Sequence, residues 1–302
     1  MNTLILSAIR TLRRILGTAD LEQLRAQRVA DGDSAASKVA QLLLAQRYGE
    51  LHRQGAPLSR FEDVEFRAFS QNGEDGILLY IFSLLGTTNR RALEICAGDG
   101  IQCNCANLIV NHGWHAVLFD GDPNKIARGT AFYANHPDTF SFPPRLAHAW
   151  ITRENVNQLV REEGFVGEID LLSLDLDGID YWVWEALDVV QPRVVVAEIQ
   201  CIWGADSAVT VPYDPSFRTQ HANGFGIYCG ASLPAFVKLA ERKGYRFVGV
   251  QQLGFNAFFV RNDLCEDVFM SANPSTCLDK PFVHWAQAQF LPLVKNMPWE
   301  QV

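Results

Sequence analysis

The sequence has no long hydrophobic run and no excess of positive charge. Its apolar stretches are strand-sized and end well before the roughly eighteen residues that a bilayer-crossing helix needs, so we predict no transmembrane helix. With 26 Lys and Arg against 34 Asp and Glu, the net charge of -8 offers no general attraction to nucleic acid or to an anionic membrane surface. We therefore expect neither a nucleic-acid-binding protein nor a membrane protein.

The sequence also lacks a pattern of paired cysteines. Its seven cysteines form an odd set without paired CxxC motifs, and a chain of 302 residues can bury a sufficient core without disulfides. The N-terminal stretch places apolar residues before Arg10, Arg13 and Arg14, which is the reverse of the charge order in a secretory signal. We therefore expect reduced cysteines and a cytoplasmic protein.

What the sequence does contain is the composition of an ordinary globular protein. Hydrophobic residues make up 48% and charged residues 20%, which excludes disordered, collagen-like and coiled-coil chains. Residues 19–55 are rich in Ala, Leu, Gln, Arg and Glu and predict helices, so we interpret residues 1–60 as a helical cap or a dimerisation arm. A dimerisation arm would make the protein a homo-oligomer. We place the main domain at residues 61–302.

After Arg91, short and almost continuously apolar runs alternate with longer amphipathic stretches. Such runs are typical of parallel strands buried on both faces by helices. They cover residues 92–96, 116–120, 169–175 and 194–199, with a less regular run at 145–151. Residues 245–250 and 256–261 are joined by a short turn and predict an antiparallel hairpin. The predicted fold is α/β and Rossmann-like: a doubly wound, mostly parallel seven-stranded sheet that ends in this hairpin.

The turn after the first predicted strand is rich in glycine. In open parallel sheets, ligands bind beyond the carboxyl ends of the strands. Here Glu94 lies in the strand, and Gly98 and Gly100 follow it; glycine lets backbone amides approach a ligand closely. A dinucleotide-binding fingerprint would need a third glycine where Cys103 stands, which weakens a nicotinamide or flavin enzyme but leaves it open.

A carboxylate closes the second predicted strand. Asp120 is followed by Gly121 and Asp122, and a carboxylate in this place can accept hydrogen bonds from both hydroxyls of an adenosine ribose. The structural alternative is that Asp120 and Asp122 only cap the next helix.

Acidic residues also close the next two apolar runs. Asp175 ends one run and Asp177 follows it, while Glu198 lies at the end of the other run, so the three carboxylates converge if these strands are neighbours. Clustered carboxylates repel one another unless a proton or cation compensates, and an all-oxygen set suits Mg²⁺ or Mn²⁺. In the alternative interpretation, Asp177 forms an Asx turn with Gly178 and Asp180 caps the following helix.

His221 lies in a polar stretch, residues 213–230, that we expect to fold over the site as a loop. Because histidine titrates near physiological pH, His221 is a candidate general base or metal ligand. An exposed loop histidine is more commonly just solvated, and this interpretation also stays open.

Taken together, these motifs resemble the FkbM-like family of methyltransferases. The resemblance covers about residues 61–264 and depends on the order and spacing of several short motifs. They are Ser70-Gln71-Asn72-Gly73-Glu74-Asp75, Glu94-Ile95-Cys96-Ala97-Gly98-Asp99-Gly100, Ala106-Asn107-Leu108, Asp120-Gly121-Asp122-Pro123, Asp175-Leu176-Asp177-Gly178-Ile179-Asp180-Tyr181 and Gly230-Ala231-Ser232-Leu233. Members often have Glu-Pro where this chain has Asp120-Gly121, which keeps the carboxylate.

The resemblance implies a class I methyltransferase fold, S-adenosylmethionine as methyl donor and a small-molecule acceptor, with O-methylation of a sugar or natural-product hydroxyl as the commonest activity. In such an enzyme, Asp175 or Asp177 would accept the proton of the acceptor hydroxyl, and His221 would be the reserve base. A Mg²⁺ or Mn²⁺ ion bound by Asp175, Asp177 and Glu198 would orient that hydroxyl. The implied cofactor-binding residues are Glu94 and Gly98 for methionine, Asp120 and Gly121 for ribose, Trp150 for adenine, Asp175 beside the methyl group, and Gln71 and Asn107 as nearby contacts.

Three alternatives remain open at this point. One is an enzyme that uses S-adenosylmethionine for other chemistry, such as intramolecular cyclisation. Another is a nicotinamide-dependent oxidoreductase. The third is a binding module without catalysis that keeps the fold. The sequence leaves open whether the acceptor atom is oxygen or nitrogen.

Overall fold

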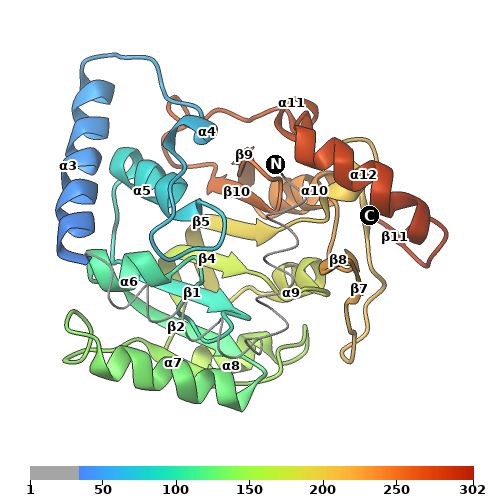
Figure 1. Ribbon diagram of the computed structural model, residues 1–302, viewed down its shortest axis with the longest axis horizontal. Coiled ribbons are helices and arrows are strands. Elements are labelled where there is room, and N and C mark those ends of the chain that lie inside the picture. The colour runs from blue at the N-terminus through green and yellow to red at the C-terminus, as the bar shows by residue number, and fades with distance from the viewer. Residues whose placement is uncertain (1–33) are drawn as a thin grey trace, which may run out of the picture.

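The structure, a computed structural model, describes residues 34–302 and is built around one large sheet (Figure 1). Its seven strands lie in the order β3-β2-β1-β4-β5-β10-β9. The first five run parallel, and β10 is antiparallel to both of its neighbours. The predicted fold class, a mostly parallel seven-stranded sheet that ends in an antiparallel hairpin, is therefore confirmed.

The strands follow the predicted apolar runs closely. They are β1 (Arg91–Ile95), β2 (His115–Asp120), β3 (Arg145–His148), β4 (Gly167–Leu174), β5 (Val190–Glu198), β9 (Tyr245–Val250) and β10 (Asn256–Arg261). Alternate side chains of these strands enter two separate core clusters, one on each face; Leu93 belongs to one cluster and Ala92 to the other. Burial on both faces explains why the runs are apolar throughout instead of alternating.

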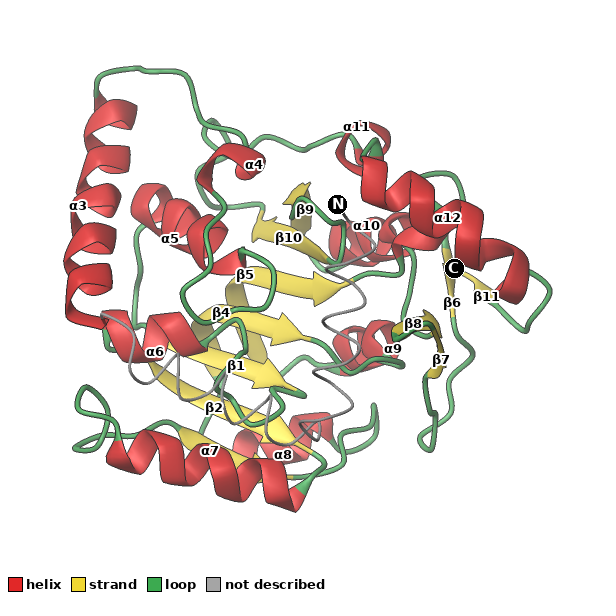
Figure 2. Cartoon of the chain, viewed as in Figure 1, coloured by secondary structure: helices red, strands yellow, loops and turns green. Residues whose placement is uncertain are grey.

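Helices cover both faces of the sheet (Figure 2). One core cluster contains side chains of α8 (Val156–Glu162), α9 (Asp180–Ala186) and α10 (Leu233–Arg242). The other contains side chains of α5 (Glu74–Leu85), α6 (Ala106–His112) and α7 (Pro123–Asn135). The acidic pair Glu74 and Asp75 forms the first turn of α5, where negative charge is favourable.

The N-terminal region contributes one long helix within the described residues. This is α3 (Ser34–Arg53), which is followed by the short α4 (Phe61–Val64). Helix α3 packs on the body of the chain: Gln41 exchanges hydrogen bonds of 3.1 and 2.9 Å with Asn107, and the rings of Tyr48 and Tyr80 lie 4.9 Å apart. The part of the predicted arm in residues 1–33 lies outside the described residues. The boundary at residue 60 and the oligomeric state remain predictions.

Six short elements and the longer helix α12 follow β5, and we did not predict them. They are η1 (Cys201–Trp203), β6 (Val209–Thr210), β7 (Gln220–Ala222), β8 (Phe225–Tyr228), α11 (Pro274–Leu278), α12 (Pro281–Val294) and β11 (Glu300–Gln301). The expected loop at residues 213–230 contains the β7–β8 hairpin. Its two-residue turn is Asn223-Gly224, both with positive φ of 53° and 84°, as the preferred tight hairpin turn requires.

No helix in residues 34–302 is both long and apolar enough to cross a bilayer.

A buried ion pair ties the amino-terminal edge of the sheet together. Arg193 Nη1 donates to Asp170 Oδ1 at 2.8 Å, and both side chains are almost completely buried. Asp170 also accepts the backbone N–H groups of Thr88, Asn89 and Arg90. The guanidinium donates further to the carbonyls of Leu85 and Gly86. This pair therefore connects the end of α5 to β4 and β5.

We predict that Asp170→Ala destabilises the protein by about 3–5 kcal/mol, because it leaves a buried guanidinium and several amides without an acceptor. Urea unfolding at equilibrium measures the change. Glu163→Ala is the matched control, since it breaks a partly exposed surface pair with Arg145 and should cost less than about 1 kcal/mol. Equal losses of stability in the two variants would contradict the role of the buried pair.

Candidate active site

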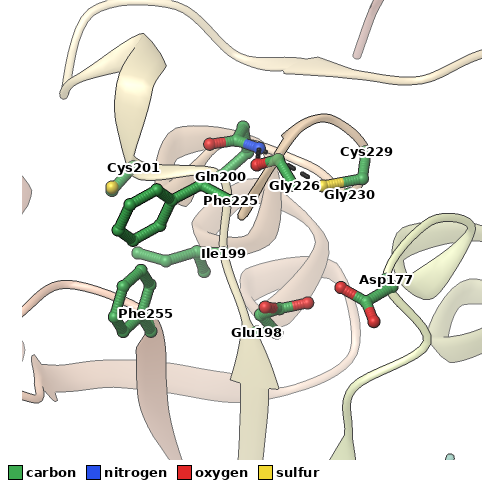
Figure 3. Close-up of a pocket in the computed structure, with 10 residues that line it drawn as sticks. All are labelled: Asp177, Glu198, Ile199, Gln200, Cys201, Phe225, Gly226, Cys229, Gly230 and Phe255. Carbon is green, nitrogen blue, oxygen red and sulfur yellow. Dashed lines mark hydrogen bonds between the residues drawn. The ribbon is translucent and has the colours of Figure 1, made fainter. Parts of the chain in front are cut away.

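A cavity of about 1150 Å³ lies at the carboxyl edge of the sheet. In Figure 1 the arrowheads of β1, β4 and β5 point toward this edge, where the β7–β8 hairpin also lies. The lining comes from the loop before α5, the turn after β1, helix α7, the ends of β4 and β5, and the hairpin. A second cavity of about 60 Å³ adjoins it and shares Asp177 and Glu198 (Figure 3). The volume is ample for a nucleotide-sized ligand.

The carboxylates of Asp175, Asp177 and Glu198 converge as predicted. One oxygen from each lies within 4.8 Å of the others. Strands β4 and β5 are parallel neighbours in which Leu174 is level with Ala197, so both strands end at the same height. Figure 3 shows the carboxylates of Asp177 and Glu198 pointing toward each other. The parallel pairing thus concentrates negative charge at one point of the cavity wall.

This concentration of charge disfavours full ionisation. Burial, and then repulsion by Asp177, raises the pKa of Asp175 to about 8. Burial and repulsion by Asp175 raise the pKa of Glu198 well above its usual range. Burial also raises the pKa of Asp177, although His221 and Lys125 partly offset this effect. The cluster therefore needs a proton or a cation to compensate its charge.

The loop that carries Asp175 and Asp177 is held by Asp180. This buried carboxylate accepts the N–H of Leu176 at 2.6 Å and that of Gly178 at 3.0 Å. We considered Asp180 as the N-cap of the helix that follows it, but Asp180 is the first residue of α9. Its side chain accepts N–H groups of the preceding loop and none from the residues that follow it in the helix. The amide of Gly178 is bonded by Asp180 and not by Asp177, which adopts a positive φ of 54°. The turn therefore leaves the Asp177 carboxylate free to face the cavity.

Glu94 and Asp120 both hold backbone amides near the glycine turn. Glu94 accepts the N–H groups of Asn104 and Cys105 at 3.0 and 2.8 Å. Asp120 accepts those of Gly98 and Asp122 at 2.9 and 2.8 Å. By contrast, the side chains of Asp175, Asp177 and Glu198 accept no backbone N–H from the described residues. These three carboxylates are left for a ligand.

Gly98 presents its backbone to the cavity. It adopts a positive φ of 64°, and a Cβ atom added there would meet no atom within 4 Å. Asp120 does not line the cavity; it lies behind the turn and holds the Gly98 amide. Of the other residues that we singled out, Gln71, Glu94 and His221 line the cavity together with the three carboxylates. His221 lies on β7, in the hairpin that forms part of the cavity wall.

Trp150, Gly121 and Asn107 are not among the residues that line the cavity. Trp150 is half exposed and packs over Gly121, where an added Cβ would approach its ring to 2.8 Å. Its Nε1 donates to the carbonyl of Pro215 at 2.7 Å, and the Arg218 guanidinium lies 4.1 Å from its ring centroid. Asn107 is fully buried and bonded to Gln41 of α3. The predicted roles of all three remain untested.

Sequence reasoning missed several residues of the cavity wall. Phe225 and Gly226 lie in the hairpin, which the Asn223-Gly224 pair between apolar residues could have revealed. Asn256 begins β10 and carried no signal of its own. Its position beside the site depends on the antiparallel pairing of β10 with β5.

No protein-family model matches the chain, and no curated protein matches it in sequence. Solved structures with a related fold include the magnesium protoporphyrin IX methyltransferase ChlM of Synechocystis, with 10% identity, a TM-score of 0.40, and coverage of 62% of this chain and 77% of that chain. Another is the N-terminal domain of EvdMO1 with SAH bound, with 14% identity, a TM-score of 0.42, and coverage of 72% and 93%. A third is the glycopeptide N-methyltransferase MtfA, with 11% identity, a TM-score of 0.40, and coverage of 67% and 98%. The similarity to each is one of fold.

The loop that supplies Gln71 is organised by a further buried carboxylate. Asp75 Oδ2 accepts the N–H groups of Ala68, Phe69 and Ser70 at 2.8, 2.6 and 2.8 Å. Burial nevertheless raises the pKa of Asp75 from 3.8 to about 6, because the three amide bonds only partly offset the loss of hydration.

We predict that Asp75 makes the protein less stable as the pH rises from about 4 to about 6, since the folded state then holds a proton that the unfolded state has lost. The effect is on the order of 3 kcal/mol for a shift of roughly two pKa units. Asp75→Asn resembles the protonated acid, so the variant should match the wild type at pH 4 and exceed its stability at pH 7. Urea unfolding across this range measures the difference; parallel pH profiles would contradict the assignment.

Proposed function

We propose that this chain is an S-adenosylmethionine-dependent methyltransferase that methylates a hydroxyl group of a small molecule. The observation that carries the proposal is the convergence of three carboxylates, free of backbone amides from the described residues, in one cavity with the exposed Gly98 turn. The motif resemblance to the FkbM-like family supports the same activity, with a sugar or natural product as acceptor. A cytoplasmic location is part of the proposal.

The residues at the turn after β1 fit this cofactor. The bare backbone of Gly98 allows a close approach, and Gln71 and Glu94 offer polar contacts beside it. The negative charge of the cavity wall complements the sulfonium and ammonium groups of S-adenosylmethionine. When bound, the cofactor supplies a methyl group on a positively charged sulfur. Asp120 contributes by holding the turn in shape and is proposed to reach the ribose at its edge.

The acidic cluster is proposed to act on the acceptor. Asp175 or Asp177, in its ionised form, would accept the proton of the acceptor hydroxyl. His221 lies close enough to Asp177 to lower its pKa and is the reserve base. A Mg²⁺ or Mn²⁺ ion on Asp175, Asp177 and Glu198 would compensate their charge and orient the hydroxyl.

We predict that S-adenosylhomocysteine raises the unfolding temperature by several degrees, because at a hundredfold excess over its Kd a ligand adds about 2.7 kcal/mol to the stability. Thermal unfolding with Mg²⁺ and with a chelator tests the metal in the same experiment. NAD is the control ligand. A shift with NAD and none with S-adenosylhomocysteine would replace the proposal by an oxidoreductase, and silence from both would favour a binding module.

We further predict that Asp120→Ala weakens S-adenosylhomocysteine binding at least tenfold, since the Gly98 and Asp122 amides lose their acceptor. Asp175→Ala should leave this binding largely intact but abolish turnover. Titration calorimetry measures the binding. Release of S-adenosylhomocysteine from S-adenosylmethionine with a panel of small alcohols, phenols and amines measures the turnover, whereas methylthioadenosine would indicate cyclisation. Asp120→Asn keeps one acceptor oxygen and should fall between; equal loss of affinity in the Asp120 and Asp175 variants contradicts this division of roles.

A further inference from the structure

We infer that Asn256 supplies a fourth oxygen ligand, its side-chain Oδ1, to a divalent cation held by Asp175, Asp177 and Glu198. The inference rests on the proposed function in so far as that function places a cation on the three carboxylates. It adds a ligand from β10, a strand that contributes nothing to the acidic cluster itself.

Asn256 lies directly opposite Glu198. The two residues are level in the antiparallel pairing of β10 with β5. The N–H of Ile199 donates to the carbonyl of Phe255 at 2.7 Å, so these two residues form a hydrogen-bonded pair. Hydrogen-bonded and non-hydrogen-bonded pairs alternate, which makes Glu198 and Asn256 a non-hydrogen-bonded pair, with Cα atoms about 4.5 Å apart. Side chains of such a pair share one face of the sheet and lie close together.

The orientation of the Asn256 amide is set by its partner. Nδ2 donates to Glu74 Oε1 at 2.8 Å, and the other oxygen of Glu74 accepts the N–H of Asn72 at 3.0 Å. A carboxylate in this place requires the amino end of the amide. Oδ1 must therefore point away from Glu74, and both Asn256 and Glu74 line the large cavity.

Asn256 Oδ1 has no hydrogen-bond partner in the described part of the chain. The side chain is only 6% exposed, so the oxygen is also shielded from bulk water. A buried carbonyl oxygen without a donor is unfavourable and rare in folded proteins. This oxygen lies on the same sheet edge as the three carboxylates, whose mutual repulsion is relieved by a proton or a cation. A cation satisfies both requirements at once.

The ligand set indicates the class of cation. Three carboxylates and one amide carbonyl are hard oxygen donors, with neither sulfur nor imidazole among them. Mg²⁺ and Mn²⁺ prefer such donors and retain water or ligand oxygens in their remaining positions. An acceptor hydroxyl would enter one of these positions, from the side of the cavity.

Direct binding of Mn²⁺ to the full chain, measured by calorimetry and by electron paramagnetic resonance of the free ion, tests the inference. We expect one Mn²⁺ site in the wild type and its loss in Asp177→Asn. Asn256→Leu, which removes the oxygen at similar volume, should weaken Mn²⁺ binding at least tenfold. Asn256→Asp keeps an oxygen and adds charge, so it should retain or strengthen Mn²⁺ binding. This variant tests the inference even if Asn256→Leu does not fold.

The matched control is Asn111→Leu. Asn111 is also a buried asparagine whose Nδ2 is bonded, to Asn107, and whose Oδ1 has no partner among the described residues, but it lies on α6 away from the cavity lining. This variant should bind Mn²⁺ like the wild type. Unchanged Mn²⁺ affinity in Asn256→Leu overturns the inference.

Binding of S-adenosylhomocysteine to the same variants separates this inference from the proposed function. If the wild type binds S-adenosylhomocysteine normally but does not bind Mn²⁺, the inference that Asn256 is a metal ligand is wrong, and the proposed methyltransferase function stands. A selective loss of S-adenosylhomocysteine affinity in Asn256→Leu, with Mn²⁺ binding intact, would assign the oxygen to the organic ligand and also overturn the inference. Mn²⁺ binding without any S-adenosylhomocysteine binding would remove the proposed function and leave the ion site.

Discussion

A carboxylate taken out of water must be met by hydrogen-bond donors or by positive charge, and the loops around this sheet are organised by that requirement. Each of five carboxylates accepts at least two backbone N–H groups from a neighbouring loop: Asp75, Glu94, Asp120, Asp170 and Asp180. Four of these loops lie beside the cavity. Its walls are therefore held by acidic side chains whose bonding capacity is largely used by the fold.

Asp175, Asp177 and Glu198 differ from these five carboxylates. Their side chains take no backbone amide from the described residues, and parallel neighbouring strands bring them within 4.8 Å. The Asp180 bonds that hold the loop also keep Asp177 in a positive-φ conformation that faces the cavity. The fold thus gathers three carboxyl groups that no backbone amide of the described residues satisfies at the carboxyl edge of the sheet, which is where this class of sheet binds its ligands.

The β7–β8 hairpin and the C-terminal helix complete the wall beyond these charges. Phe225 of the hairpin packs against Phe282, Trp285 and Phe290 of α12, with ring centroids 5.6 to 6.0 Å apart. Phe225 and Phe255 line the small cavity next to Asp177 and Glu198 (Figure 3). An acceptor that approaches the acidic cluster from this side therefore meets aromatic rings, and helix α12 keeps those rings in place.

The sequence by itself determined the sheet and the acidic ends of its strands. Apolar runs report burial on both faces, and a parallel sheet places every strand end at one edge, so the meeting of Asp175 and Glu198 followed from local pattern and topology. Tertiary structure alone decided which polar groups are hydrogen-bonded within the fold and which are left for a ligand. Asp120 bonds the Gly98 amide, Trp150 lies between Gly121 and Arg218, and Asn256 faces Glu198 across an antiparallel pair. These contacts join residues far apart in the chain, and their register is set by packing, which no local pattern records.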